Sequence, residues 1–140
     1  MQTTLAIIKP DACGRHEGAI LARLQDDGFR IRALRLLRLT EAQARAFYEI
    51  HRGRPFYESL VAFMTSGPVV PVALEREDAV ARLRAVIGAT DPAEADAGTI
   101  RADFAESKER NAIHASDSVD NAAREVAFFF SEAERLASAS

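Results

Sequence analysis

The residue types with the most chemical potential lie together in one short segment near the C-terminal end of the chain. Within residues 111–118, Asn111, His114, Ser116, Asp117 and Ser118 bring together an amide, an imidazole, two hydroxyls and a carboxylate. A predicted helix follows, and its N-terminus offers free backbone N–H groups and the positive end of the helix dipole to an anion. The pattern is typical of a nucleophilic or acid–base histidine. It also fits polar residues that only cap the helix, with His114 filling space.

Glu125 is a carboxylate within the apolar stripe of that predicted helix, which spans 119–130. A carboxylate in this position lies either at the edge of the stripe or beside a partner that satisfies it. A histidine nitrogen would be such a partner, and the hydrogen bond would also set the tautomer of the ring.

Three basic residues occupy positions suited to an anionic ligand. Lys9 directly follows the apolar run 4–8, at the carboxyl end of a predicted strand. Arg84 lies on a predicted helix and Arg101 in a long loop, and an arginine fork matches a phosphate group in a bidentate manner. Arginine abundance is not itself a signal, because 16 of the 18 basic residues are Arg and Ala is the commonest residue, as a coding bias would produce. Each of the three also fits a solvated surface charge.

Hydrophobic patterning predicts the elements that must position these side chains. Apolar runs and alternation predict strands at 4–8, 29–39, 69–74 and 112–114, and helical periodicity predicts helices at 17–27, 40–51, 56–64, 77–87 and 119–130. The alternation of 29–39 slips, which indicates a bulge, and Pro71 favours an edge position or a bulge for its strand. Segment 88–112 is predicted as a long and therefore functional loop. The order of elements predicts an α/β sandwich with helices packed on a four-stranded sheet.

Composition excludes several classes of protein. The 140 residues fit one domain over 1–140, and a formal charge of −3 argues against a polybasic nucleic-acid binder. A single cysteine, Cys13, rules out an internal disulfide and a cysteine-based zinc site. Neither a P-loop nor a G-x-G-x-x-G motif occurs, and no metal-ligand spacing is present. The longest uncharged stretch, 59–74, is short for a membrane span and no signal peptide is evident, so we expect a soluble, cytoplasmic protein.

Taken together, the sequence blocks resemble the nucleoside diphosphate kinase family, and the resemblance covers essentially the whole chain. The matching blocks, in order along the chain, are 8–11, 54–56 with Tyr48 upstream, 66–70, 88–93, 98–104 and 111–118. The last block has the pattern Asn-x-x-His-x-Ser-Asp-Ser, which makes the resemblance specific.

The resemblance implies a ferredoxin-like α/β sandwich, with a four-stranded antiparallel sheet covered by helices. It implies reversible, ping-pong transfer of the γ-phosphate of ATP or another nucleoside triphosphate to a nucleoside diphosphate. His114 would carry the phosphate on Nδ1, Glu125 would orient the ring through Nε2, and Ser116 would support them. The residues that fall where the family contacts phosphates and ribose are Lys9, Tyr48, Arg84, Thr90, Arg101 and Asn111, and Phe56 and Leu60 fall beside the base. Mg²⁺ is the implied cofactor, held mainly by substrate phosphates rather than by protein ligands.

Two positions depart from the family pattern. Ala115 stands where glycine is usual, and a positive φ there would strain alanine. Lys108 stands where an apolar residue commonly closes the base slot, and its methylene stem is suited to replace it. The resemblance also implies a homo-oligomer, with a tetramer favoured over a dimer or hexamer.

Two other classes of protein compete with this interpretation. A catalytically silent family member would act as an oligomeric scaffold, but it would be expected to lack some of the site residues. An RNA-recognition module shares the order of elements, but it needs aromatic residues that strands 4–8 and 69–74 do not have. Nucleic acid and membranes are therefore not expected partners.

Overall fold

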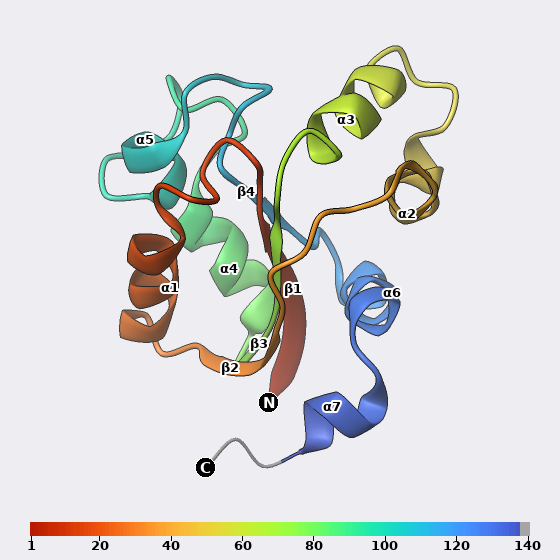
Figure 1. Ribbon diagram of the computed structural model, residues 1–140. Helices are drawn as coiled ribbons and strands as arrows, with labels where there is room; N and C mark the ends of the chain where they lie inside the picture. Colours follow the sequence, from red (N-terminus) through yellow and green to blue (C-terminus); the bar gives the residue numbers. More distant parts are fainter. Residues whose placement is uncertain (138–140) are drawn as a thin grey trace.

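A computed structural model describes residues 1–137, so the last three residues of the domain expected over 1–140 lie outside this range. Four strands form one antiparallel sheet in the order β2-β3-β1-β4: β1 Gln2–Ile8, β2 Arg30–Leu34, β3 Val70–Arg76 and β4 Ile113–Ala115. The two central strands pair over their full length, from Gln2 opposite Arg76 to Ile8 opposite Val70. This arrangement, drawn in Figure 1, confirms the predicted ferredoxin-like architecture.

Helices cover both faces of the sheet, and the side chains of β1 contribute to a hydrophobic core on each face. Ala6 and Ile8 belong to a core beneath α1 and α4, whereas Leu5 and Ile7 belong to a second core beneath α2, α3 and α6. Successive side chains of a strand point to opposite faces, so a continuous apolar run is what a strand covered on both sides requires. The helices are α1 Glu17–Asp26, α2 Glu41–Phe47, α3 Tyr57–Met64, α4 Ala79–Ile87, α5 Ile100–Phe104, α6 Val119–Phe129 and α7 Glu132–Leu136, with a short 3₁₀ turn at Glu49–His51.

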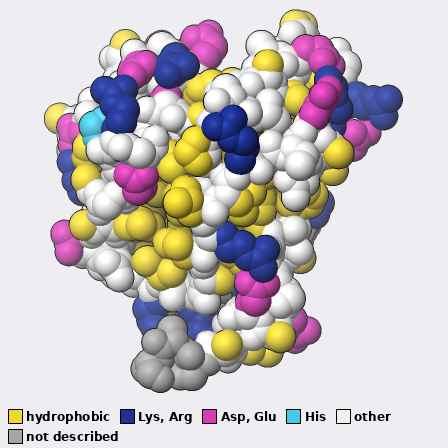
Figure 2. Space-filling model, in the orientation of Figure 1, with side chains coloured by type: hydrophobic (Ala, Val, Ile, Leu, Met, Phe, Trp, Pro, Cys, Tyr) yellow, Lys and Arg dark blue, Asp and Glu magenta, His cyan; other side chains and the backbone are white. Residues whose placement is uncertain are grey.

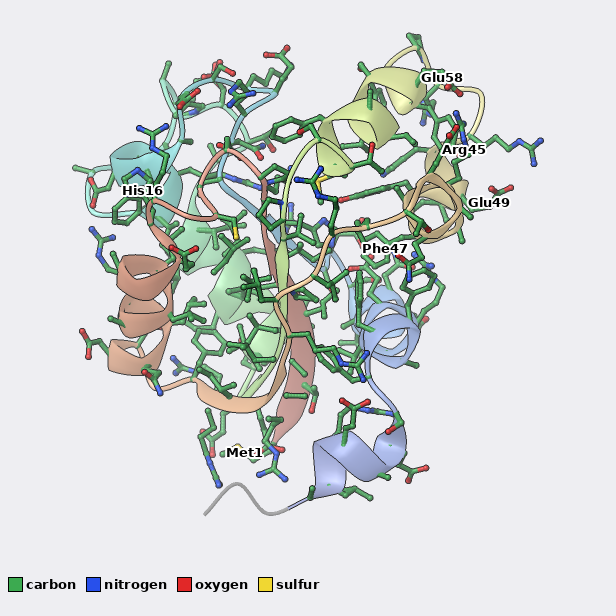
Figure 3. The ribbon with its side chains drawn as sticks, in the orientation of Figure 1. Met1, His16, Arg45, Phe47, Glu49 and Glu58 are labelled. Atoms are coloured by element: carbon green, nitrogen blue, oxygen red, sulfur yellow. The ribbon has the colours of Figure 1, made fainter. Side chains whose placement is uncertain are left out.

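The predicted helix at 40–51 is divided in two. Thr40 and Gln43 form the expected capping box at its start. The α-helix nevertheless ends at Phe47, and the chain continues through the 3₁₀ turn into α3. Arg45 of α2 donates to both carboxylate oxygens of Glu58 at 2.9 and 2.8 Å, which joins α2 to α3 (Figure 3).

β3, which contains Pro71, is a central strand, so of the two predicted alternatives, an edge position or a bulge, the edge position is wrong. The register between β2 and β3 shifts between Ile31 and Ala33, so the expected irregularity is present but comes before the slips in alternation at Leu34 and Leu37. The Pro71 carbonyl accepts a hydrogen bond from the backbone N–H of Arg35, just beyond the end of β2. The proline nitrogen therefore faces the irregular end of the ladder, where a missing N–H removes no regular strand bond.

The predicted long loop contains a helix. Thr99 caps α5 by accepting a hydrogen bond from the backbone N–H of Ala102. β2 ends at Leu34, well before the predicted end at 39, and is followed by an isolated bridge between Leu37 and Val69. The other elements lie within a few residues of their predicted bounds, except for α7, which the pattern did not indicate. Within residues 1–137, no helix is both long and apolar enough to span a membrane.

Candidate active site

A cavity of about 700 Å³ opens between the α2–α3 segment, α4, α5 and the strand ends of β1 and β4. Ten of the eleven site residues predicted from the sequence line it: Lys9, Tyr48, Phe56, Leu60, Arg84, Thr90, Arg101, Asn111, His114 and Glu125. The eleventh, Ser116, is fully buried behind Glu125. The structure thus brings together side chains that are more than 100 positions apart in the sequence.

His114 of β4 is held by Glu125 of α6. Its Nε2 lies 2.7 Å from Glu125 Oε1, and the Ser116 hydroxyl donates to the same oxygen at 2.8 Å. An ionised carboxylate only accepts hydrogen bonds, so Nε2 carries the proton and Nδ1 of the neutral ring carries the lone pair. The arrangement defines one tautomer and leaves the Nδ1 lone pair free of this contact.

Burial and neighbouring charges set the protonation state of this pair. Burial, assisted by the positive charges of Lys9 and Arg101, lowers the pKa of His114 despite the opposing effect of Glu125. Burial alone would raise the pKa of Glu125, but the hydrogen bonds from His114 and Ser116 outweigh it and the pKa is lowered. A neutral imidazole and an ionised carboxylate therefore face each other at neutral pH.

Two residues that the sequence analysis did not assign to the site pack around this pair. The Phe47 ring meets the His114 ring edge to face, with centroids 5.5 Å apart and an interplanar angle of 73°. The Arg124 guanidinium lies 5.9 Å from the Phe47 centroid and 3.7 Å from Glu125 Oε2. Phe47 belongs to the apolar stripe of α2, and nothing in that stripe signals contact with a polar site.

Lys9 and Arg101 are buried cations at the floor of the cavity. Lys9 Nζ donates to Asn111 Oδ1 at 2.8 Å, and Arg101 donates to the carbonyls of Gly88, Asn111 and Ile113 at 3.1, 3.3 and 2.7 Å. Burial and the nearby Arg101 charge lower the pKa of Lys9 to about 8. Burial and the charge of Arg84 lower the pKa of Arg101 to about 10. Two such poorly solvated cations favour an anionic ligand.

Tyr48 presents another unsatisfied group. Its hydroxyl is buried without a hydrogen-bond partner among residues 1–137, and the residue lines the cavity. Burial and the Glu125 charge raise the pKa of the phenol, so the hydroxyl keeps its proton and can donate a hydrogen bond. Arg84 and Thr90 are exposed at the rim, and the Thr90 carbonyl accepts from the Asn111 amide at 3.3 Å.

An aromatic side chain stands at the outer end of the cavity. The Phe56 side chain is 47% exposed, which leaves a ring face open to a ligand. His51 packs against its edge, with centroids 5.1 Å apart. Leu60 and Lys108 line the same region, so the predicted base slot has an apolar wall and a long basic side chain.

Ala115 does not have the positive φ that would strain it. Within residues 1–137 the non-glycine residues with positive φ are Asp78 and Ala112. Ala115 is a regular member of β4, paired with Ala6 of β1. The left-handed residue is instead Ala112, with φ +74°, two positions before His114.

The cavity's carboxylates suit a metal that is held chiefly by a substrate. Residues 1–137 contain no group of three or more His, Cys, Asp or Glu side chains placed to bind a metal ion. Besides Glu125, the carboxylates that line the cavity are Glu109 and Asp117. This sparse set fits Mg²⁺, which retains several waters and commonly binds through one or two carboxylates together with substrate phosphates.

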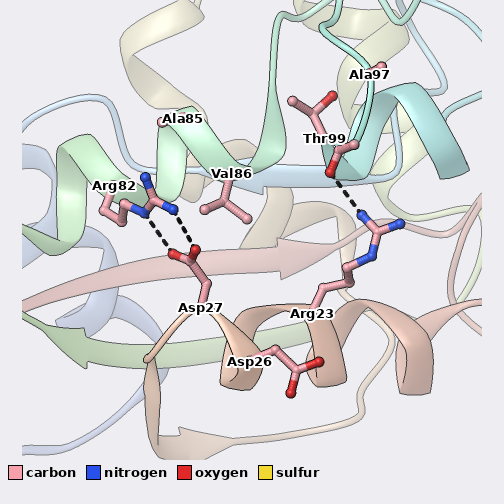
Figure 4. A pocket seen from close by; sticks show the side chains of 9 residues that line it. Arg23, Asp26, Asp27, Arg82, Ala85, Val86, Ala97 and Thr99 are labelled. Carbon is pink, nitrogen blue, oxygen red and sulfur yellow. Dashed lines mark hydrogen bonds and ion pairs between the residues drawn. The ribbon is translucent and has the colours of Figure 1, made fainter.

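A second cavity, of about 360 Å³, lies between α1, α4 and the segment before α5 (Figure 4). Three of the charged side chains that line it, those of Arg23, Asp27 and Arg82, are paired with other side chains or with backbone. Arg82 donates to both oxygens of Asp27 at 2.8 and 2.5 Å, and Arg23 donates to the Gly98 carbonyl at 3.2 Å and pairs with Asp103. None of the predicted site residues lines this cavity.

The fold and the main cavity define an α/β protein in which a carboxylate-held histidine lies among buried cations, an arrangement suited to an anionic ligand. Comparison with known proteins gives the same result. A family model described as nucleoside diphosphate kinase matches residues 2–135. The chain is 57% identical over 134 residues to a nucleoside diphosphate kinase of Acidiphilium cryptum (strain JF-5), covering 95% of this chain and 96% of that protein.

Solved structures agree with the sequence relatives. The Aquifex aeolicus nucleoside diphosphate kinase superposes with a TM-score of 0.94 at 48% identity, covering 96% of this chain and 99% of the other. The Halobacterium salinarum nucleoside diphosphate kinase, solved in complex with CDP, has a TM-score of 0.92 at 36% identity, covering 99% and 93%. The chain therefore belongs to the nucleoside diphosphate kinase family, whose members transfer phosphate between nucleotides.

Proposed function

We propose that the protein transfers the γ-phosphate of ATP or another nucleoside triphosphate reversibly to a nucleoside diphosphate, through a phosphohistidine on Nδ1 of His114. The observation that carries this proposal is the His114–Glu125 hydrogen bond of 2.7 Å, which occupies Nε2 and leaves the Nδ1 lone pair for attack. The cavity around the ring, with its buried cations and aromatic rim, is suited to a nucleotide, and a relative was solved with CDP.

Each half-reaction exchanges one bond for another. In the first, the Nδ1 lone pair forms a bond to the γ-phosphorus while the bond from that phosphorus to the β-phosphate oxygen breaks, and the diphosphate leaves. In the second, a β-phosphate oxygen of the acceptor attacks the phosphohistidine and the P–N bond breaks. Nε2 keeps its proton throughout and donates it in the hydrogen bond to Glu125, whose negative charge stabilises the positive charge that develops on the phosphorylated ring.

Cationic side chains would neutralise the transferring group. Lys9 and Arg101 supply charge from the buried floor, and Arg84 supplies it from the rim. The unpartnered Tyr48 hydroxyl and the Asn111 amide are the neutral donors near them. When bound with the nucleotide, Mg²⁺ would further withdraw charge from the phosphate oxygens, and Asp117 and Glu109 are the carboxylates available to its waters. The charge on the phosphoryl oxygens would then be compensated on several sides.

The base is proposed to lie between the Phe56 ring and Lys108, beside Leu60. Stacking on an aromatic face holds any base, because every base has a π-face. Stacking of this kind does not read the hydrogen-bonding edge of the base. Broad tolerance of the base follows from this geometry.

The pH dependence of kcat/KM should be bell-shaped. Protonated His114 cannot attack, and since its pKa is lowered, activity should persist below the ordinary histidine value of about 6.5 before it falls. Lys9 binds phosphate only when charged, so kcat/KM should also fall as the pH rises through about 8. Measuring initial rates at low substrate tests both limbs. Substitution Lys9→Gln should remove the alkaline limb, whereas an alkaline limb unchanged in that variant would contradict its assignment to Lys9.

Glu125→Ala should leave a slower enzyme with the same chemistry. The substitution removes the group that fixes the tautomer and leaves the nucleophile in place, so we expect a loss of about 10- to 100-fold in the rate of His114 phosphorylation. Rapid-quench measurement of a single turnover would give this rate. Glu132→Ala, at an exposed position of α7, is the matched control and should leave the rate unchanged. An unchanged rate in Glu125→Ala would show that Glu125 only supports the fold.

The test of the proposed function uses ATP labelled on the γ-phosphate, with Mg²⁺ and no acceptor. The protein should acquire label through an acid-labile, base-stable bond, and GDP added afterwards should remove it as labelled GTP. A folded protein that acquires no label would contradict the proposal and favour the scaffold interpretation.

We also propose that the protein forms a homo-oligomer, with a tetramer as the favoured state. β2 is an edge strand of the sheet, and Leu34 and Leu36 are exposed at its end and just after it. Figure 2 shows hydrophobic side chains gathered across the middle of the face where β2 and the following segment lie. Edge strands and apolar patches of this kind support self-association, which analytical ultracentrifugation measures directly.

A further inference from the structure

The backbone just before β4 makes a tight, disfavoured turn. Ala112 has φ +74°, and the Ile113 N–H donates to the Asn111 carbonyl at 2.9 Å, which closes a three-residue γ-turn around Ala112. Residues other than glycine avoid this conformation because the Cβ atom crowds the backbone. Surrounding contacts must therefore hold the turn in place.

Asp11 supplies the most direct of these contacts. Its Oδ2 accepts a hydrogen bond from the Ala112 N–H at 3.0 Å, across 101 positions of sequence. The Ala112 carbonyl accepts from the Lys9 N–H at 2.8 Å, so both peptide groups of Ala112 are bound to the segment that follows β1. That segment is itself rigid, since the N–H groups of Ala12 and Cys13 both donate to the Lys9 carbonyl at 3.0 and 2.9 Å.

Besides this contact, the Asp11 carboxylate acts on the site through its charge, which partly offsets the lowering of the Lys9 pKa. It is 4% exposed and does not line the cavity, and its Oδ1 has no hydrogen-bond partner among residues 1–137. Burial raises the pKa of Asp11, although the hydrogen bond from Ala112 opposes that effect. Because burial of this carboxylate is unfavourable, its presence here indicates that the hydrogen bond from the Ala112 N–H is important to the structure.

The turn held by Asp11 connects the groups that would act on the phosphate. Asn111 precedes Ala112 and its side chain binds Lys9 Nζ, while His114 follows two positions later. Arg101 donates to the carbonyls on either side of the turn, those of Asn111 and Ile113. A change in the backbone at Ala112 would therefore displace the amide, the imidazole and the supports of both buried cations together.

We propose that Asp11 is a positioning residue for the phosphotransfer described under Proposed function, on which this inference rests. By accepting the Ala112 N–H, Asp11 holds the left-handed turn and so places Asn111 and His114 toward the cavity. It does not contact the nucleotide. Its contribution is to the rate of His114 phosphorylation, through the geometry of the turn.

The test measures single-turnover phosphorylation of His114 from labelled ATP in Asp11 and Ala112 variants. Asp11→Ala should phosphorylate His114 about 10- to 100-fold more slowly than the unaltered protein. Asp11→Asn keeps a carbonyl acceptor and should lie within about threefold of it. Ala112→Gly, in which the residue adopts positive φ without steric cost, should by itself have little effect.

The double variant Asp11→Ala/Ala112→Gly distinguishes positioning from general support of the fold. Glycine adopts a positive φ without the support of Asp11. The double variant should therefore phosphorylate His114 at least about threefold faster than Asp11→Ala. Ile20→Val, which shortens a fully buried side chain of α1 outside the cavity, is the control: it should lower the melting temperature without slowing phosphorylation. If Asp11→Ala does not fold, the double variant is still expected to fold and to react.

The outcomes separate the two proposals. If the unaltered protein is labelled and folded Asp11→Ala is labelled equally fast, the role of Asp11 is refuted and the proposed function stands. A double variant as slow, or as unfolded, as Asp11→Ala also refutes it. If the unaltered protein acquires no label, the proposed function fails and the role of Asp11 fails with it.

Discussion

His114→Ala is expected to fold normally and to lose phosphotransfer by at least about 10⁴-fold, because no other side chain replaces its nucleophile. The His114 side chain is 19% exposed and lies at the cavity wall, so its removal leaves both hydrophobic cores intact. Glu125 keeps its hydrogen bond from Ser116, and the loss of the other bond should cost only about 1 kcal/mol of unfolding free energy. Coupled measurement of GDP phosphorylation and a denaturant titration test both expectations.

The matched control is His16→Ala. His16 precedes α1 and packs against Phe104, with ring centroids 5.0 Å apart, and it does not line the main cavity. Its substitution should leave the rate unchanged. Substantial activity in folded His114→Ala would contradict the phosphohistidine route, whatever the result for His16.

Arg101→Ala should have the second largest effect, since it is expected to lower both stability and activity. The buried guanidinium donates to three backbone carbonyls, those of Gly88, Asn111 and Ile113. Leaving buried carbonyls without donors should reduce the free energy of unfolding by about 3 kcal/mol. Loss of a cation that faces the transferring phosphate should reduce kcat by about 10²- to 10³-fold.

Arg84→Ala serves as the comparison for Arg101→Ala. Arg84 lines the same cavity but is exposed, so its removal should change the unfolding free energy by no more than about 0.5 kcal/mol while still slowing the reaction. Denaturant titrations of the two variants separate the structural effect from the catalytic one. Equal stability of Arg101→Ala and the unaltered protein would show that the three carbonyls do not depend on Arg101.

The parts of the fold with strong local patterns were predictable from the sequence. The apolar run of β1 and the stripe of α6 were both recognised, because a doubly covered strand and an amphipathic helix each leave a clear periodicity. α5 was missed because five residues are too few to show a helical period. The edge position expected from Pro71 was wrong because a central strand accepts a proline where its partner strand ends. The end of β2 cannot be read from the sequence around Pro71.

Type and spacing pointed to the segment around His114 and to Glu125, and the family resemblance supplied most of the other candidate residues, but their surroundings were not predictable. His114, Glu125 and Ser116 lie within twelve residues, so their motif was visible in the sequence. Arg101 looked like a solvated charge because its burial arises from contacts with Gly88 and β4. The left-handed turn at Ala112 leaves no local signal, since alanine has no preference for positive φ and the stabilising Asp11 is 101 positions away.

The most direct test of the account is to determine which nitrogen carries the phosphate. Protein labelled uniformly with ¹⁵N would be phosphorylated with ATP and Mg²⁺ in the absence of acceptor and studied by ¹⁵N and ³¹P NMR. Because Nε2 is bound to Glu125 at 2.7 Å, we predict a single phosphohistidine, at His114, with phosphorus bonded to Nδ1. Phosphate on Nε2, or on a residue other than His114, would contradict the account.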